Sequence, residues 1–282
     1  MTLGQHGLAL GLVLLDVLVR GERLRQLVPV PLLRAMAINT SGDALAAITP
    51  ARVGGEPLRF VALQRSGASA ATLLAAFATE LLADTVWMVL GLLVLALAFA
   101  RQAAVLWQRI AHMVTAPGII WFGAAAIAAI VVVRLAWQSG RLPAPVVTSL
   151  ADGWRIIWTR PFPVVVRVLA LTFVSLAARI AILPVLASSV PGVSIPDVIA
   201  GSFALQLAQA LAPTPGGAGA VELGFMAGFA QAASAAQVTG LLVTWRVYTL
   251  ALGAIAGGLL ILRAGWLRRA STLFETPPTA SC

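Results

Sequence analysis

Long runs of apolar residues, separated by short polar stretches, form the main pattern along the chain. About 20 apolar residues in a helix cross the ~30 Å hydrocarbon core of a bilayer. The first run has no basic segment before it and no small-residue cleavage site, so we expect a retained span rather than a signal peptide. The runs predict full membrane spans at 3–19, 70–100, 116–137, 162–187 and 237–262.

Two further apolar stretches, 32–63 and 195–230, are interrupted near their middle by proline and glycine. The first interruption reads "AITPARVGGE" and the second reads "LAPTPGGAGAVELGF". Each stretch predicts two short helices joined by a turn, and Ser194 with Pro196 marks the start of the second stretch. Irregular backbone at membrane depth is tolerated only where it is buried in protein or lines a wet cavity. We therefore expect the interruptions to build a polar site inside the membrane.

The remaining segments predict no separate soluble domain. The loop 138–161 predicts a short amphipathic helix at the membrane interface, with Trp154 and Trp158 as anchors. The tail 271–282 is expected to be disordered. The pattern thus predicts an all-α polytopic membrane protein with about five full spans and two broken, re-entrant-like hairpins in one transmembrane domain over 1–270.

The composition agrees with a membrane protein and excludes other classes. The 282 residues are 60% hydrophobic and 10% charged, with a mean hydropathy of +0.96, which no ordinary soluble domain has. The arginines are scattered between apolar spans rather than clustered, which argues against nucleic-acid binding. The single cysteine, Cys282, precludes an internal disulfide, and the two histidines have no cysteine partners, so neither a metal nor a cofactor is expected.

The positions of the arginines predict the orientation in the membrane. Arginines follow the first span, flank the loop between the third and fourth spans, and follow the last span. All three groups lie on one side if the N-terminus is outside, and cytoplasmic loops are the arginine-rich ones. The C-terminus is therefore predicted to be cytoplasmic.

The two interrupted stretches, each with the long helix that follows, form a weak internal repeat. The units cover about 32–100 and 195–262, and the predicted topology gives them opposite orientations. Inverted repeats with interrupted helices are how many secondary transporters build a midplane site, and helix N-termini at the breaks suit an anion. The aligned pairs are Glu56 with Glu222, Glu80 with Arg246, Asn39 with Ser202, and Asp43 with Gln206.

Two motif blocks resemble those of the lysylphosphatidylglycerol synthase transmembrane (flippase-like) family. The first block is "TPARVGGEPLRFVALQRSGASAATLLAAFATELLADTV", and the second comprises "APTPGGAGAVELGF" and "VTWRVYTL". The resemblance implies a multi-pass protein of the bacterial inner membrane. Some members of that family flip aminoacylated phospholipids, and others are tied to the export of polyisoprenyl-linked or other lipids.

The chain departs from the family pattern in three ways. Its 282 residues contain no soluble aminoacyl-transferase domain, so we do not expect it to synthesise lysyl lipid. The first helix block has Glu80 and Asp84 without the family's arginine beside the glutamate. The N-terminal region is one helix shorter than the family pattern.

Ionisable and polar residues in the apolar segments supply the candidate binding site, because such residues are costly in a bilayer and need a partner or a function. The arginines would neutralise phosphate, and the carboxylates would orient them or carry a coupling proton. The candidate substrate-binding residues are Asn39, Asp43, Arg52, Glu56, Arg59, Glu80, Asp84, Arg179, Thr214, Gly216, Gly217, Glu222 and Arg246.

Several of these residues also have a purely structural interpretation. Glu80 and Asp84 share one helix face and could form a cation or proton site, or a salt bridge to Arg52 or Arg59. Arg246 could bind a phosphate, although a direct ion pair with Glu222 that locks the second hairpin is the favoured alternative.

Other polar positions leave the same choice open. Arg179 ends a stripe with Thr172 and Ser175, so it could bind phosphate or belong to a hydrogen-bonded helix–helix seam. The stripe of Ser202, Gln206 and Gln209 is expected to serve packing. The glycines in the turns are expected to serve turn geometry. The residues His6, His112 and Asp16 are expected at the membrane interface.

The leading functional hypothesis is a flippase or transporter that moves an anionic or lipid-linked headgroup across the bacterial inner membrane. Its lipid would be the main binding partner, and biosynthetic enzymes are possible protein partners. A non-transporting partner of a lipid or glycan biosynthesis pathway is the alternative. An intramembrane lipid-modifying enzyme ranks lower, because no histidine nucleophile, no Asp-rich metal motif and no large catalytic loop is recognised. No Walker motif is present, so we do not expect ATP to drive transport within this chain.

Overall fold

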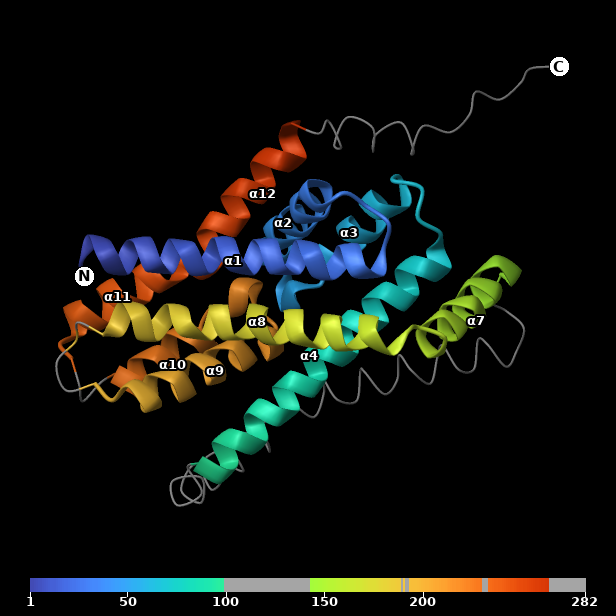
Figure 1. Ribbon diagram of the computed structural model, residues 1–282. Coiled ribbons are helices and arrows are strands. Elements are labelled where there is room, and N and C mark those ends of the chain that lie inside the picture. The colour runs from blue at the N-terminus through green and yellow to red at the C-terminus, as the bar shows by residue number, and fades with distance from the viewer. Residues whose placement is uncertain (99–142, 189, 191–192, 230–232, 264–282) are drawn as a thin grey trace. The chain divides into compact units, whose positions relative to one another are not determined.

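The computed structural model describes residues 1–98, 143–188, 190, 193–229 and 233–263, and every regular element in those ranges is helical (Figure 1). The all-α class predicted from the sequence is therefore confirmed for these residues. The predicted span 116–137 and the predicted disordered tail 271–282 lie outside them.

Four segments are long and apolar enough to cross a membrane. They are α1 (Leu3–Leu27), α4 (Ala70–Ala98), α8 (Phe162–Ala187) and the continuous segment Ala235–Arg263. At 1.5 Å per residue, the shortest of them, with 25 residues, is about 38 Å long. They match four of the five predicted spans. The last segment consists of α11 (Ala235–Arg246), the π-helix η3 (Val247–Ala251) and α12 (Leu252–Arg263).

Helix α1 is longer than the predicted span 3–19. It continues to Leu27 because no helix breaker occurs before Pro29, and Val28 ends it in an extended conformation. The arginines at 20 and 23, which we expected to flank the span, are therefore inside a regular helix. Arg23 is buried, and so is Asp16 one turn before Arg20.

Both interrupted stretches form a helix, a turn and a second helix. The first comprises α2 (Leu32–Ile48), η1 (Pro50–Arg52) and α3 (Gly55–Gln64). The second comprises α9 (Ile195–Leu211), η2 (Pro215–Gly217) and α10 (Ala220–Phe229). In each stretch the break occurs where proline removes a backbone donor. That these hairpins are re-entrant, with both ends on the same side of the membrane, stays a prediction.

The glycines of the second turn are required by its backbone. Gly216 and Gly217 both adopt positive φ angles, 58° and 72°, which glycine reaches without steric cost. A Cβ at Gly217 would also lie 2.9 Å from the Cα of Gln209. The turn therefore packs directly against the end of α9.

The chain divides into two compact units, residues 1–68 with 163–282, and residues 69–162. In the second unit, α4 packs on α7 (Ala144–Trp158), and Gly153 allows the close approach because a Cβ there would lie 3.1 Å from the carbonyl oxygen of Ala71. Trp154 and Trp158 are 63% and 72% exposed, and their role as membrane-interface anchors stays a prediction. The single domain expected over 1–270 stays a prediction.

In the first unit, α2 is the central helix and contacts α1, α3 and α12. The contact with α12 is very close, because a Cβ on Gly257 would overlap the carbonyl oxygen of Thr40. Helices α1 and α8 run alongside each other and are joined by side-chain hydrogen bonds (Figure 1). The apolar core lies next to them and includes Phe225 and Trp245, both fully buried.

Candidate functional site

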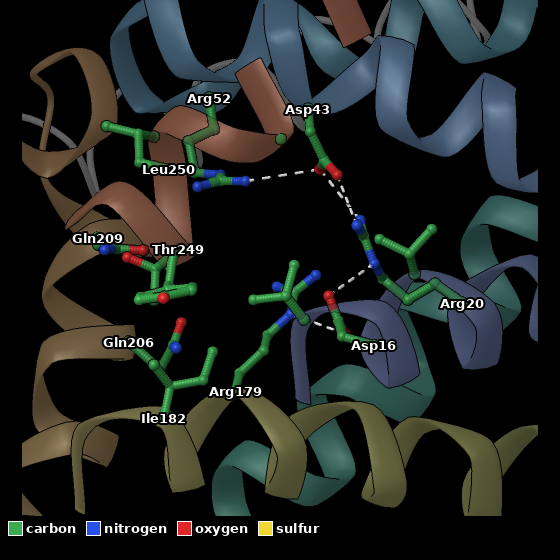
Figure 2. Close-up of a pocket in the computed structure, with 14 residues that line it drawn as sticks. Asp16, Arg20, Asp43, Arg52, Arg179, Ile182, Gln206, Gln209, Thr249 and Leu250 are labelled. Atoms are coloured by element: carbon green, nitrogen blue, oxygen red, sulfur yellow. Dashed lines mark hydrogen bonds and ion pairs between the residues drawn. The ribbon is translucent and has the colours of Figure 1, made fainter. Parts of the chain in front are cut away.

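A polar cavity of about 60 Å³ lies inside the first unit, between both interrupted stretches, α1, α8 and the last long segment (Figure 2). At about 10–15 Å³ for each water-sized sphere, the cavity has room for several waters or for one small polar group. Its charged lining residues are Asp16, Arg20, Asp43, Arg52 and Arg179.

The charged lining is organised around two carboxylates, and Asp16 is the first of them. Arg20, one helical turn later, places its Nε 3.1 Å from Asp16 Oδ2. From α8, Arg179 donates from Nε to Asp16 Oδ1 at 3.0 Å, and Ser175 donates from Oγ to the same oxygen at 2.5 Å. Three side chains thus satisfy one carboxylate that is only 7% exposed.

Asp43 is the second carboxylate of the charged lining. Arg20 donates to both of its oxygens, from Nη1 at 3.0 Å and from Nη2 at 2.5 Å. This is the bidentate geometry that makes arginine–carboxylate pairs strong. Arg20 therefore bridges a carboxylate on α1 and a carboxylate on α2. Arg52 approaches Asp43 more loosely, with Nη2 3.9 Å from Oδ1.

The lining has three guanidinium groups and two carboxylates, which leaves one net positive charge. Both carboxylates are engaged by Arg20, whereas Arg52 makes no hydrogen bond from its side chain among the described residues. The cavity therefore offers free cationic donors, and its chemistry suits an anion.

Arg52 also has an unusual backbone. Its φ angle of 59° makes it the one non-glycine residue with positive φ in the described part of the chain. Such a conformation is costly for a residue with a Cβ and is found where the surrounding structure requires it, frequently at functional sites. Here it ends η1 and directs the side chain into the cavity (Figure 2).

A neutral polar wall faces the arginines. Tyr248 and Thr249 belong to the π-helix η3, a type of segment that is rare and frequently found at functional sites. Gln206 and Gln209 come from α9. The side chain of Gln209 is buried, and its Nε2 has no hydrogen-bond partner among the described residues.

The turns of the two interrupted stretches meet in this unit. Turn η1 contacts η2, and α2 and α9 each contact the turn of the other stretch. A Cβ on Gly216 would lie 3.0 Å from Leu250, which lines the cavity, and 3.7 Å from the carbonyl oxygen of Ala47. The turns of the two predicted repeats thus lie against each other beside the charged residues.

Three of the predicted binding residues, Asp43, Arg52 and Arg179, line the cavity together. Asn39 is buried one turn before Asp43 in α2 but does not line it. Glu56 instead pairs with Arg59 through a contact of 2.8 Å within α3.

The other two predicted carboxylates of the first repeat, Glu80 and Asp84, lie in α4, in the second compact unit. Glu80 is buried. Their predicted role in binding or proton transfer, and the alternative salt bridge to Arg52 or Arg59, stay predictions.

Glu222 and Arg246 form the ion pair that the structural interpretation predicted, with 2.5 Å between Arg246 Nη2 and Glu222 Oε1. Arg246 also donates from Nη1 to the carbonyl oxygen of Gly216 at 2.5 Å, so it ties α11 to the second turn. Thr214 closes the same turn by donating to the carbonyl oxygen of Ala218 at 2.7 Å. None of these residues lines the cavity.

The polar stripe on α8 is a hydrogen-bonded seam, and its last member also lines the cavity. Thr172 accepts from Arg23 at 3.1 Å, and Ser175 donates to Asp16. On α9, Ser202 donates to the carbonyl oxygen of Ile180 at 2.9 Å, which is the packing role that we expected. Gln206 and Gln209 differ from that expectation, because they line the cavity.

Two central residues of the site were missed from the sequence. We expected Asp16 to be an interfacial residue without a role in the site and Arg20 to follow the end of the first span. Helix α1 instead continues past both residues, and their side chains pair with residues of α8 and α2. A usable signal was present: an acidic and a basic residue four apart in an apolar helix share a face and form an ion pair. His6 lies 3.0 Å from the Tyr248 hydroxyl through Nδ1, and His112 is outside the described residues.

The described residues contain no group of three His, Cys, Asp or Glu side chains that could hold a metal ion.

The comparisons with known proteins give one match. The model of a family described as "Lysylphosphatidylglycerol synthase TM region" matches residues 2–257. No curated protein and no solved structure matches the chain. The matched family and the four long apolar helices together indicate a multi-pass membrane protein of lipid modification or transport.

Proposed function

Because the chain belongs to the lysylphosphatidylglycerol synthase TM region family, we propose that it is a flippase or transporter for an anionic or lipid-linked headgroup. The headgroup would enter the polar cavity while its acyl or prenyl tails stay in the bilayer. We further propose that the protein acts in the bacterial inner membrane with its C-terminus in the cytoplasm, as the arginine distribution predicts.

One observation carries the proposal: polar residues from both interrupted stretches line a common cavity, together with charged residues from the first stretch and from α1 and α8. Asp43 and Arg52 come from the first stretch and Gln209 from the second, while Arg179 comes from the α8 helix between them. A charged group inside an apolar helical bundle is expensive unless it serves a pathway or a bound ligand. The net positive charge of the lining favours a negatively charged ligand.

The lengths of the hairpin helices support a site at membrane depth. Helices α2 and α9 each have 17 residues, which gives about 26 Å, and α3 and α10 each have 10 residues, about 15 Å. The second helix of each hairpin is therefore about half of the ~30 Å hydrocarbon thickness. We interpret the two as re-entrant hairpins of an inverted repeat whose turns meet near the midplane.

The cavity holds only a small group in this conformation, so transport requires it to open to each side in turn. The bridge of Arg20 between α1 and α2 keeps the charges compensated while the cavity is closed. An entering anion would take up the unused donors of Arg52 and Arg179 without displacing that bridge.

Reconstitution into liposomes tests the proposal. Purified protein is inserted with a headgroup-labelled anionic phospholipid, and the label is followed across the bilayer with a membrane-impermeant quencher. Movement of the intact lipid supports a flippase. Chemical change of the lipid would instead indicate an intramembrane enzyme, and neither movement nor change would favour a non-transporting partner.

The variant Arg52→Gln sharpens this test. A lost hydrogen bond to a charged group is worth about 1.5–3 kcal/mol, so the rate should fall roughly 10- to 100-fold. Arg25→Gln is the matched control, because the Arg25 side chain is 49% exposed and its one ion-pair partner among the described residues is Glu22, one helical turn earlier. Equal rates for both variants and the unmodified protein would contradict a transport role for the cavity.

A further inference from the structure

We propose that His6 and Tyr248 form a proton-binding site coupled to the cavity, so that an anion enters the cavity together with a proton. The inference rests on the proposed function and deepens it by naming the coupling ion. The proton would bind outside the charged lining, because His6 itself does not line the cavity.

The pair joins the start of α1 to the wall of the cavity. His6 lies three residues after Leu3, which is 91% exposed, and its Nδ1 is 3.0 Å from the hydroxyl oxygen of Tyr248. Tyr248 belongs to the π-helix η3 and lines the cavity. The predicted topology places this end of α1 on the outer side of the membrane. A proton from that side therefore reaches a residue in direct contact with the cavity wall.

The hydrogen bonds of the pair can form in either protonation state of His6. The Tyr248 hydroxyl has a second neighbour, the carbonyl oxygen of His6 at 3.4 Å. When the imidazole is neutral, the hydroxyl donates to Nδ1. When the imidazole is protonated, Nδ1–H donates to the hydroxyl oxygen, and the hydroxyl hydrogen turns toward the carbonyl oxygen. A proton can therefore be gained or lost at His6 without breaking the contact between α1 and η3.

Few titratable groups surround His6. Tyr248 faces it from η3, and the terminal amino group of Met1 lies at the same exposed end of the chain. On the side of α8, the neighbouring Gln5 donates to the uncharged Ser188 hydroxyl. Imidazole is the side chain that ordinarily changes its charge between about pH 5 and 8. His6 is therefore the group of this cluster whose charge responds to moderate acidity.

The charge of the cavity lining couples this proton to an anion. Three guanidinium groups and two carboxylates leave one positive charge on the lining. A proton on His6 adds a second positive charge to this region, which is unfavourable without an anion and favourable with one. By linkage, the proton and the anion each strengthen the binding of the other by the same factor.

The distance between the two sites limits the size of this factor. Along α1, Asp16 of the lining is ten residues from His6, which is about 15 Å in a helix. The other charged residues of the lining are Arg20, Asp43, Arg52 and Arg179. Couplings between separate sites range from about 5- to 150-fold, and over this distance we expect the lower end, about 5-fold.

Anion binding to the purified full-length protein in detergent tests the coupling. The probe is dimethyl phosphate, a small phosphodiester whose single negative charge is constant in this pH range. Its affinity, measured from the shift of the thermal unfolding midpoint against its concentration, should be about 5-fold tighter at about pH 6 than at about pH 8. Binding in weakly buffered solution should also take up protons. An equal affinity at both pH values would overturn the inference.

Three variants assign the pH dependence to the pair. His6→Gln keeps a polar side chain that cannot be protonated, so its affinity for dimethyl phosphate should be equal at the two pH values. Tyr248→Phe removes the hydroxyl that holds the imidazole at the wall and should reduce the ratio. Gln5→Leu is the matched control, because it breaks the neighbouring contact with Ser188 without changing a titratable group, and it should keep the ratio of the unmodified protein.

Each ratio compares one variant with itself, so a general loss of stability cancels. A His6→Gln ratio equal to that of the unmodified protein would overturn the inference.

The liposome assay separates this inference from the proposed function. Movement of the labelled lipid at a rate that does not depend on pH would contradict proton coupling only. Proton-linked binding of dimethyl phosphate without movement of the lipid would contradict transport only.

Discussion

Arg20 joins the two charged halves of the site, because its single guanidinium group binds Asp16 on its own helix and Asp43 on α2. Buried charges are tolerated when each is paired and hydrogen-bonded, and removing one partner leaves the others uncompensated. The strained backbone of Arg52 belongs to the same cluster. At the scale of single residues, the cavity is therefore a charge-compensated network with cationic donors left over.

The variant Asp16→Asn tests this network. It leaves Arg20 and Arg179 with one carboxylate fewer, and we expect a loss of stability of about 3–5 kcal/mol, as for other broken buried pairs. The control Glu22→Gln removes a carboxylate from the same helix, where the partner Arg25 is half exposed, and should cost less than about 1 kcal/mol. Thermal unfolding in detergent, followed by tryptophan fluorescence, measures both. Similar losses for the two variants would show that the Asp16 cluster contributes no more than a surface pair.

At the scale of elements, close helix crossings at glycine hold the walls of the cavity together. Gly257 brings α12 against the Thr40 carbonyl of α2, and Gly21 brings α1 against Met36 of the same helix. Small residues allow this approach between helices in a membrane protein, where dispersion contacts replace the hydrophobic effect. Because α2 carries Asp43, its position between α1 and α12 determines where that carboxylate lies.

Gly257→Ala should separate α2 from α12. The added methyl group overlaps the Thr40 carbonyl, a backbone atom that cannot turn aside, so we expect a loss of about 1–3 kcal/mol and weaker anion binding. The adjacent Gly258→Ala is a matched control, since a Cβ there meets nothing within 4 Å. It should be neutral or stabilising by up to about 1 kcal/mol, because alanine favours helix. Equal unfolding midpoints for the two variants would contradict the importance of this crossing.

At the scale of the whole molecule, the arginine distribution predicts the orientation of the chain in the membrane, and the two hairpins meet at a common cavity. Three groups of arginines lie in segments that the predicted topology assigns to the cytoplasmic side, whereas Arg101 and Arg109 fall on the opposite side. Within α1, Arg20 lines the cavity and Arg23 donates to Thr172. The two hairpins, oppositely oriented in that topology, contribute to one cavity rather than to separate sites. The proposed transport requires such an arrangement, because one site must be reached from either face of the membrane.

The native Cys282 provides a direct test of the orientation. A membrane-impermeant maleimide should label it only after the inner membrane is permeabilised, because we predict a cytoplasmic C-terminus. In a second variant, Cys282→Ser combined with Gln102→Cys, the new thiol should react in intact cells, since residues 101–115 are predicted on the opposite side. Reaction of both thiols from the same side would contradict the predicted topology.

The order of apolar runs and Pro/Gly breaks by itself determined the helical class, four long spans, both helix–turn–helix stretches and the family resemblance. These features depend on local physics: the hydrophobic length of a helix, and the loss of a backbone donor at proline. The ion pair of Glu222 with Arg246 was also predictable, because Glu222 follows the second interrupted turn and Arg246 lies on the next helix of the same repeat.

Only the tertiary structure decided which charges share the cavity. Asp16 and Arg179 are 163 positions apart, and Arg20 and Asp43 are 23 apart, so no local pattern relates them. The position of Arg20 after an apolar run had predicted a residue that flanks the membrane span. In the structure Arg20 points into the protein, because α1 continues as a regular helix against α2 and α8. Hydropathy measures the free-energy cost of placing a charged side chain among lipids. The partner that offsets this cost by forming an ion pair depends on how the whole chain packs.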